Sequence, residues 1–474
     1  MSEFSSGFRL ERVREPELVF ANDGGAKDPR AGLLKYGPCP RAKGVEHEVV
    51  NVGIVGDSRS ISMMESLLRD MRTGVPSKKN RKRWKPDFPG LGTNSELRFD
   101  YQTLEKWKGR IQPSDIEDIG EIRDRGHRTE TAFNHIKYQI QRVCKQTPPP
   151  DLVFVVIPER IVEYCSDPDT DTNEIRTEDG NFRSRIKIVG MQEKPTQLMT
   201  PRALRGGNDV QERSEMAWNI AVGMLYKARE GRPWKLADLR SRTCYAGISF
   251  YQERSDDPDT RAAIAQVFID DGRNFVIEGG AVEDVATEER QTHISYSDAK
   301  RLVENILEEY GNQRDEMPRR LVLHKSSNFL DDETRGFADG ATDVKTKEFI
   351  TVRKRHPLRL FGQGDNPPLR GTLAIPPGER EYYLYTTGFV PEQSVYNNPG
   401  TPKPLVLRPH PEYFSGDYHR ICEEILKFTK LDWNSSDFCK RLPVTIGIAD
   451  AVSEILAEPA ASDINLQTHY YYYM

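Results

Sequence analysis

Apolar runs and helical periodicity alternate along the first half of the chain. Residues 49–57 read VVNVGIVGD, an apolar run closed by Gly and Asp, which predicts a buried parallel strand. A helical pattern follows over 63–68, another fits 129–145, and DLVFVVIP at 151–158 predicts a second buried strand. This strand–helix–strand order predicts a doubly wound, Rossmann-like layer. It lacks the glycine-rich dinucleotide fingerprint, so it does not predict NAD binding.

The second half has a different order of elements. A helix is predicted over 209–230, with Gly231 as its stop, and strands dominate the segment that follows. The later ranges are a strand at 244–251, a hairpin at 265–280, a helix at 297–310, a strand at 319–326 and helices at 418–430 and 448–457. Antiparallel strands followed by helix and strand predict the mixed sheet of an RNase H-type fold, giving an α/β protein.

Composition places the chain among soluble globular proteins. Of its 474 residues, 36% are hydrophobic and 30% are charged, which suits two or three domains. No apolar run is long enough to cross a bilayer and the first residues lack a signal-peptide pattern, so we expect a cytoplasmic protein with no membrane partner. None of the six cysteines forms a C-x-x-C pair, which favours free thiols over a zinc site.

Positive charge is clustered although the net charge is −5. Lysine and arginine concentrate at 78–85, 183–187 and 352–359, and Trp84 adds a stacking surface to the first run. Nucleic-acid binding depends on the local density of Lys and Arg. For the first and third runs a solvated face is an equally good interpretation.

Several segments, taken in order, resemble the MID–PIWI half of Argonaute proteins, and most closely the short prokaryotic Argonautes. They are WNIAVGMLYKAREGRPWKL, CYAGISFY, LVLHKSSNF, LYTTGFVP and LKFTKLDWNSSDFCKRLPVTIGIADAV. The resemblance implies a Rossmann-like MID domain at 48–230 and an RNase H-like PIWI domain at 231–474. Residues 1–47 would then form an N-terminal arm that contacts a partner. About fifty residues are too few for the N and PAZ domains of longer Argonautes.

The same resemblance implies a PIWI domain that does not cut. Active members hold two divalent metals with several carboxylates. Where they carry aspartates, this chain has Ser249 and Ser326, while Asp450 keeps an acid at the last position. Serine is a neutral and weak ligand, so we expect no cleavage. Glu278, Glu283 and Asp284 are acids that nothing fixes to a catalytic role, and Asp450 is interpreted as a carboxylate at a helix N-terminus.

The resemblance also implies a site for the 5′ phosphate of a guide. Arg183, Lys187 and Gln197 have the spacing of the MID signature, and Lys227 is the fourth member. Arg183 and Lys187 lie one helical turn apart, so both reach the same side. An exposed basic helix face is the alternative for these two residues.

Further contacts follow from the resemblance. Gln197, in a loop position, and the carboxylate of Met474 would hold a structural Mg²⁺ at the phosphate. Thr429, Lys430 and Asn434 would contact the guide backbone. The four tyrosines before Met474 would wedge the terminus or stack on a base, and an unnatural tail is the alternative interpretation.

These expectations combine into a guide-dependent sensor. We expect it to bind a guide RNA and a complementary single-stranded DNA target without cleavage. It would then activate an APAZ-containing effector, with a TIR, sirtuin-like NADase or nuclease domain, in prokaryotic immunity. One alternative is a guided nuclease that uses non-standard acids. Another is a regulator that binds a small nucleotide.

Overall fold

The structure is a computed structural model, and it describes most of the chain. The residues outside the description are 1–6, 41–47, 79–84, 167–175, 178–179, 208–209, 230, 253–260, 270–273, 283–285, 289–290, 363, 379, 394–395, 397–399, 462–463 and 465–466. Only the backbone is described for 176–177, 180, 229, 251–252, 261–266, 278–282, 286–288 and 291–292.

The first sheet is parallel and five-stranded. Its order is β10-β7-β4-β5, with β6 also paired to β4. The strands are β4 (Glu48–Gly56), β5 (Phe99–Gln102), β6 (Lys108–Arg110), β7 (Leu152–Val156) and β10 (Thr196–Met199). The apolar runs at 49–57 and 151–158 therefore form adjacent buried strands, as predicted.

Helices cover both faces of this sheet. Val52 and Ile54 of β4 share a core with α2 (Ser58–Thr73) and α8 (Arg213–Arg229), whereas Val55 points into a second core on the other face. That second core contains α3 (Pro113–Glu121), α4 (Arg125–Cys144), α5 (Glu159–Cys165) and α6 (Phe182–Gln192). Alternate strand residues thus feed opposite layers, which confirms the doubly wound arrangement.

The second sheet is mixed and nine-stranded, in the order β1-β19-β20-β21-β18-β17-β12-β13-β14. Its three central strands β12, β17 and β18 are parallel, and the pairs outside them are antiparallel. The strands are β1 (Arg9–Arg12), β12 (Thr243–Gln252), β13 (Arg261–Ile269), β14 (Asn274–Val282), β17 (Arg320–Lys325), β18 (Thr346–Arg353), β19 (Thr372–Ile375), β20 (Tyr382–Leu384) and β21 (Leu405–Pro409).

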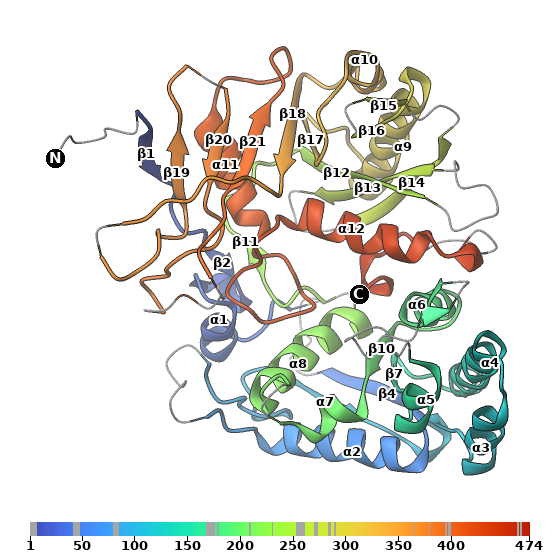
Figure 1. Cartoon of the computed structure of the whole chain (residues 1–474). Helices are drawn as coiled ribbons and strands as arrows, with labels where there is room; N and C mark the ends of the chain where they lie inside the picture. The colour runs from blue at the N-terminus through green and yellow to red at the C-terminus, as the bar shows by residue number, and fades with distance from the viewer. Residues whose placement is uncertain are drawn as a thin grey trace.

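Two pairs of helices enclose the second sheet. α9 (Tyr296–Arg314) and α10 (Asp331–Gly340) share one core with it, and α11 (Tyr418–Phe428) and α12 (Val444–Leu456) share the other. Figure 1 shows α12 lying between the second sheet and the helices of the first half. The predicted α/β fold with two sheets of these types is confirmed.

Helix α12 packs unusually closely on β12. A Cβ atom placed on Gly247 would lie 1.8 Å from the main-chain oxygen of Thr445 in α12. Glycine is therefore needed at this position for the helix backbone to approach the strand. The contact fixes α12 over the end of the central strands.

The N-terminal arm is built into the second half of the chain. β1 pairs with β19 at the sheet edge, and β2 (Leu18–Val19) lies between β3 (Gly25–Ala26) and β11 (Lys235–Leu236). α1 (Pro29–Tyr36) follows, capped by Asp28. Glu15 forms buried ion pairs at 2.8 Å with Arg370 and with Lys430.

The remaining elements are short. They are α7 (Pro201–Arg205), the β8–β9 hairpin (Arg176–Thr177 and Gly180–Asn181), the β15–β16 hairpin (Ala286–Glu288 and Gln291–His293), and 3-10 turns at Ala21–Asp23, Glu105–Trp107, Pro459–Ala461 and Tyr470–Tyr472. Among the described helices, none combines the length and apolarity needed to span a bilayer.

Candidate nucleic-acid interface

Helix α6 presents Arg183 and Lys187 one turn apart. Asn181 caps the helix, and its side-chain oxygen accepts a hydrogen bond from the Arg183 amide at 2.9 Å. The Arg183 side chain is exposed, but Lys187 is 2% exposed and its ammonium donates to the main-chain oxygen of Thr196. An exposed basic helix face is therefore the wrong interpretation for Lys187.

Lys227 on α8 meets Gln197 and Met474 from distant parts of the chain. Its buried ammonium donates to Gln197 Oε1 and, at 3.1 Å, to the main-chain oxygen of Met474. Gln197 belongs to strand β10 rather than to the predicted loop, because Gln197 stands opposite Phe154 of β7 in the parallel register. The predicted convergence of these three residues is nevertheless present.

The electrostatics of this cluster favour the binding of an anion. Burial, with the charges of Lys227 and Arg183, holds the pKa of Lys187 well below its usual value. Burial and Arg183 also lower the pKa of Lys227 to about 7, against an opposing effect of Asp432. Lys187 contacts a neutral main-chain oxygen, and burial penalises the charged form of both ammonium groups. An anion placed among them would restore both lysines to their charged form.

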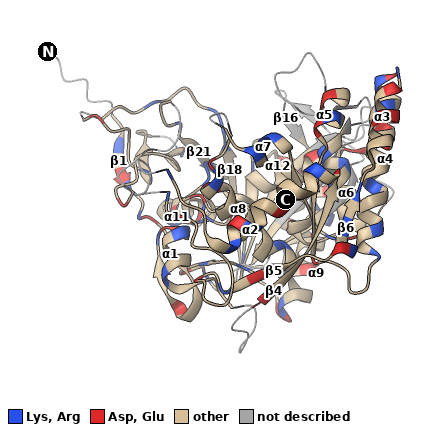
Figure 2. Ribbon diagram, turned by 90° about the horizontal axis from the view of Figure 1, so that it is seen from below, with Lys and Arg blue, Asp and Glu red and all other residues tan. Residues whose placement is uncertain are grey.

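A cavity of about 510 Å³ opens beside this cluster. Arg183, Gln197 and Asn434 line it together with polar and apolar side chains from β10, α8 and the α7 region. Figure 2 shows Lys and Arg residues on α7 and α6, on the side of the molecule seen from below. We call Arg183, Lys187, Gln197, Lys227 and Met474 the cation pocket.

The tyrosines before Met474 hold the chain end in the cation pocket. Tyr470, Tyr471 and Tyr473 are buried, and the ring of Tyr471 lies edge-on to that of Tyr226 at 5.8 Å. The hydroxyl of Tyr473 donates to the main-chain oxygen of Gln467 at 2.8 Å. The segment is packed into the protein as the wedge interpretation requires, and a loose tail would not show this burial. Figure 1 places the C-terminus between the two sheets.

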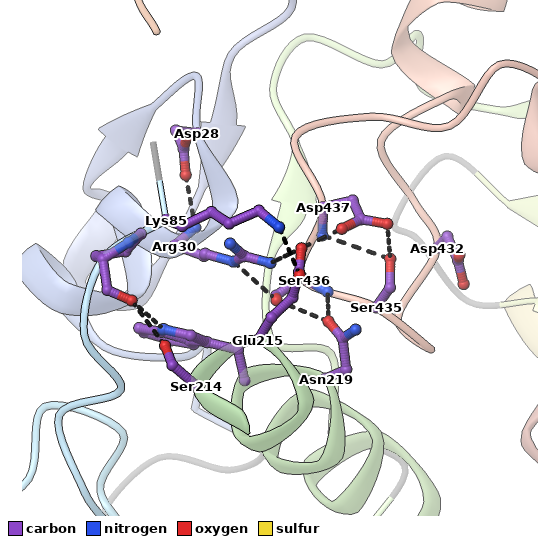
Figure 3. A network of polar contacts seen from close by, with 12 residues as sticks. Asp28, Arg30, Lys85, Ser214, Glu215, Asn219, Asp432, Ser435, Ser436 and Asp437 are labelled. Carbon is purple, nitrogen blue, oxygen red and sulfur yellow. Dashed lines mark hydrogen bonds and ion pairs between the residues drawn. The ribbon is translucent and has the colours of Figure 1, made fainter. Parts of the chain in front are cut away.

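A polar network on the other side of α8 fixes one wall of the cavity (Figure 3). Asn219, which lines the cavity, accepts hydrogen bonds from the amide and hydroxyl of Ser436 at 2.8 and 2.9 Å. Arg30 of α1 donates to the Ser436 hydroxyl at 3.0 Å, and Lys85 pairs with Glu215 at 2.6 Å. Sequence reasoning missed this network, since its members come from four distant segments and carry no shared motif.

Thr429 and Lys430 are placed differently from Asn434. The Thr429 hydroxyl contacts Arg370 at 2.8 Å, and the Lys430 ammonium is buried against Glu15 and the ring of Phe438. Neither side chain reaches the surface, so this placement gives no support to their predicted contact with a guide backbone. Asn434 is exposed in the cavity beside Arg183.

The positions aligned with the cutting site lie at the end of the central strands. Ser249 follows Ile248, which pairs with Lys325 in the parallel register, so Ser249 and Ser326 are neighbours on β12 and at the end of β17. The Ser249 hydroxyl lies 3.0 Å from that of Ser453 on α12. Within the described part of the chain, no group of three or more His, Cys, Asp or Glu residues is arranged to hold a metal.

Asp450 is not a helix N-terminal carboxylate, so that prediction is wrong. α12 begins at Val444, after Pro443, and Asp450 lies in its middle. Its carboxylate instead forms an ion pair with Lys354. Of the other acids considered, Glu283 and Asp284 lie outside the described residues, as does the side chain of Glu278, and most of the basic run at 78–85 does too.

Solved structures of Argonaute and Piwi proteins share the fold of nearly the whole chain. Clostridium butyricum Argonaute, solved with a guide DNA and a 19-mer target DNA, matches at 17% identity and a TM-score of 0.64, over 97% of this chain and 55% of its own. Drosophila Piwi matches at 14% identity and a TM-score of 0.60, over 98% of this chain and 56% of its own. One structure of Aquifex aeolicus Argonaute matches at 15% identity and a TM-score of 0.58, over 97% of this chain and 54% of its own.

These similarities define the class of fold. The chain has an Argonaute-like fold and spans slightly more than half the length of the solved structures it matches. No protein-family model matches the chain, and no curated protein sequence matches it either.

Proposed function

We propose that this chain binds a 5′-phosphorylated guide, which we expect to be RNA. The terminal phosphate of the guide would lie in the cation pocket. The observation that carries the proposal is the convergence of buried Lys187 and Lys227 with exposed Arg183 at the mouth of a cavity. A terminal phosphate carries up to two negative charges and accepts several hydrogen bonds, which matches two amines and a guanidinium. The Argonaute-like fold adds support, because one of the matching proteins was solved with a guide and a target.

Mg²⁺ is proposed as a structural ion at the same place. Gln197 Oε1 and the main-chain oxygen of Met474 contact one ammonium, so they are close enough to share a small cation. Oxygen donors suit Mg²⁺, which commonly binds through few protein ligands together with phosphate oxygens. Bound there, the ion would neutralise part of the charge of the phosphate.

We further propose that a complementary single-stranded DNA pairs with the guide and is not cut. The support is that serines stand at positions 249 and 326 and that the carboxylate of Asp450 is already paired with Lys354. Pairing would activate a separate effector protein, for which we propose an APAZ-containing partner with a TIR, sirtuin-like NADase or nuclease domain in prokaryotic immunity. The domain limits 48–230 and 231–474, and a partner contact by the arm at 1–47, belong to the same proposal.

A guide-loading and cleavage assay tests this proposal. The protein is loaded with a 5′-phosphorylated guide RNA, mixed with labelled complementary or scrambled DNA, and supplied with Mg²⁺ or Mn²⁺. We expect sequence-dependent retention of intact DNA. Product that forms in the wild type and is lost in Asp450→Ala would instead establish the guided nuclease. A regulator of small nucleotides would show no dependence on oligonucleotide length and little dependence on salt.

A further inference from the structure

The carboxyl ends of three parallel strands meet beneath α12. Ser249 and Ser326 are neighbours in the register of β12 and β17, and Lys354 directly follows the last residue of β18. Alternate residues of β18 point to the same face, so Lys354 shares the α12 side with Val352. The ends of these strands therefore carry two serines and one lysine. At the serine positions, the resemblance implies metal-binding aspartates in active members.

Asp450, a carboxylate at this end of the strands, already has a cation. Lys354 and Asp450 form an ion pair in which their side chains are 29% and 43% exposed. Asp450 lies one helical turn before Ser453, whose hydroxyl meets that of Ser249 at 3.0 Å. An ammonium group thus stands where hydroxyl groups and one acid converge. Ion pairs this exposed are weak, so a competing anion can displace Asp450.

Arg441 lies beside Lys354, and Arg359 lies near Arg441. Arg441 donates to the main-chain oxygen of Lys354, and burial together with the nearby charge of Arg359 lowers the pKa of Arg441. Arg359 donates to the main-chain oxygens of His356 and Leu358, each at 2.7 Å. Among the described residues, neither arginine forms an ion pair with a carboxylate. The local charge is therefore positive even when Asp450 is counted.

We infer that Lys354 takes the place of a divalent cation at this site and, with Arg359 and Arg441, binds one backbone phosphate of the guide–target pair without metal. This inference rests on the proposed function, because it requires a paired strand in the channel. Asp450 acts as an internal substitute for the phosphate, holding Lys354 in position until the strand arrives. The third basic run, at 352–359, then contains a binding group rather than a solvated face alone.

Neutral phosphate analogues locate the contact. Single methylphosphonates are placed in turn at every backbone position of the target and of the guide, and affinity is measured for the guide-loaded protein. One charge-assisted contact accounts for roughly a ten-fold difference in affinity. We expect one position to show this loss in the wild type and to show none in Lys354→Met. Lys347→Met, on the opposite end of β18, is the matched control and keeps the wild-type profile.

The sign of the Asp450→Asn effect separates an ammonium site from a metal site. Removing the competing carboxylate frees Lys354, so target affinity should rise by a few-fold, unchanged by EDTA once the guide is bound. At a metal site, both Asp450→Asn and EDTA would instead weaken target binding. The inference is overturned if no backbone position is coupled to Lys354, or if Asp450→Asn weakens binding. Absence of any guided target binding would instead refute the proposed function.

Discussion

The cation pocket differs from the strand edge, by which we mean the carboxyl ends of β12, β17 and β18 beneath α12. The two regions differ in how their charged groups are compensated. In the cation pocket, Lys187 contacts a neutral main-chain oxygen, and Lys227 contacts Gln197 and the terminal residue Met474. Burial, together with nearby positive charge, lowers the pKa of both lysines. At the strand edge, Lys354 has a carboxylate partner and His324 is buried in neutral form. In the first region burial disfavours the charged form of both lysines, whereas in the second Lys354 has a carboxylate partner within the protein.

Helix α12 belongs to both regions. It carries Asp450 and Ser453 at the strand edge, and Glu454 lines the cavity beside the cation pocket. Just beyond its end, Glu458 accepts a hydrogen bond at 2.8 Å from the amide of Asn181, the cap of α6. A change in the position of α12 would therefore alter both the cation pocket and the strand ends beneath the helix.

The largest effect should come from Gly247→Ala. The new methyl group would overlap the Thr445 backbone, and neither strand nor helix backbone can move without disturbing the core. We expect a loss of about 4 kcal/mol or more in the free energy of unfolding, measured by urea denaturation.

Gly223→Ala in α8 is the matched control, because nothing lies within 4 Å of its added Cβ. Replacement of a helical glycine by alanine should stabilise by up to about 1 kcal/mol. Equal stability of the two variants would show that α12 does not sit tightly on β12.

The sequence predicted the elements better than their environments. Apolar periodicity located β4, β7 and α9, since burial of a face dictates the residues along it. It did not reveal the burial of Lys430, because its partner Glu15 is distant in the sequence. The start of α12 was placed too late, since the β-branched residues after Pro443 resemble a strand. Spacing found Lys187 and Gln197, but only the fold shows that Lys187 is buried.

A smaller effect concerns pH and His324. The imidazole is buried, with Nδ1 at 2.9 Å from the Thr445 hydroxyl, and burial lowers its pKa from 6.5 to about 3. Between these values the unfolded chain binds a proton that the folded chain does not. The stability that the neutral, buried imidazole of His324 contributes is therefore present above pH 6.5 and is lost as the pH falls towards 3.

We expect this histidine to remove roughly 2 kcal/mol of unfolding free energy between pH 6.5 and about pH 5. His324→Gln, which keeps a polar group for Thr445, should show a correspondingly shallower decline in denaturation experiments at each pH. Parallel pH profiles for the two proteins would contradict a neutral, buried histidine at the strand edge.

The smallest effect is expected at Arg30, in the polar network beside α8 (Figure 3). Arg30→Met removes the hydrogen bond to Ser436 and the 3.7 Å ion pairs with Glu215 and Asp437. Glu215 stays paired with Lys85, and Asp437 stays paired with Lys440. We expect a loss of about 1 kcal/mol in stability and a change of only a few-fold in guide affinity. A complete loss of guide binding would mean that the arm takes part in the cation pocket.

The central claim is that the cation pocket binds a terminal phosphate, and the preference for phosphorylated over unphosphorylated guides measures it most directly. Titrations of both guides would be compared for the wild type, for Lys187→Ala and for Lys145→Ala, an exposed lysine outside the pocket. Loss of a buried, hydrogen-bonded charge contact should weaken phosphorylated guides by roughly 100-fold in Lys187→Ala. Unphosphorylated guides should hardly change, and Lys145→Ala should behave as the wild type. Equal weakening of both guides in Lys187→Ala would contradict the assignment.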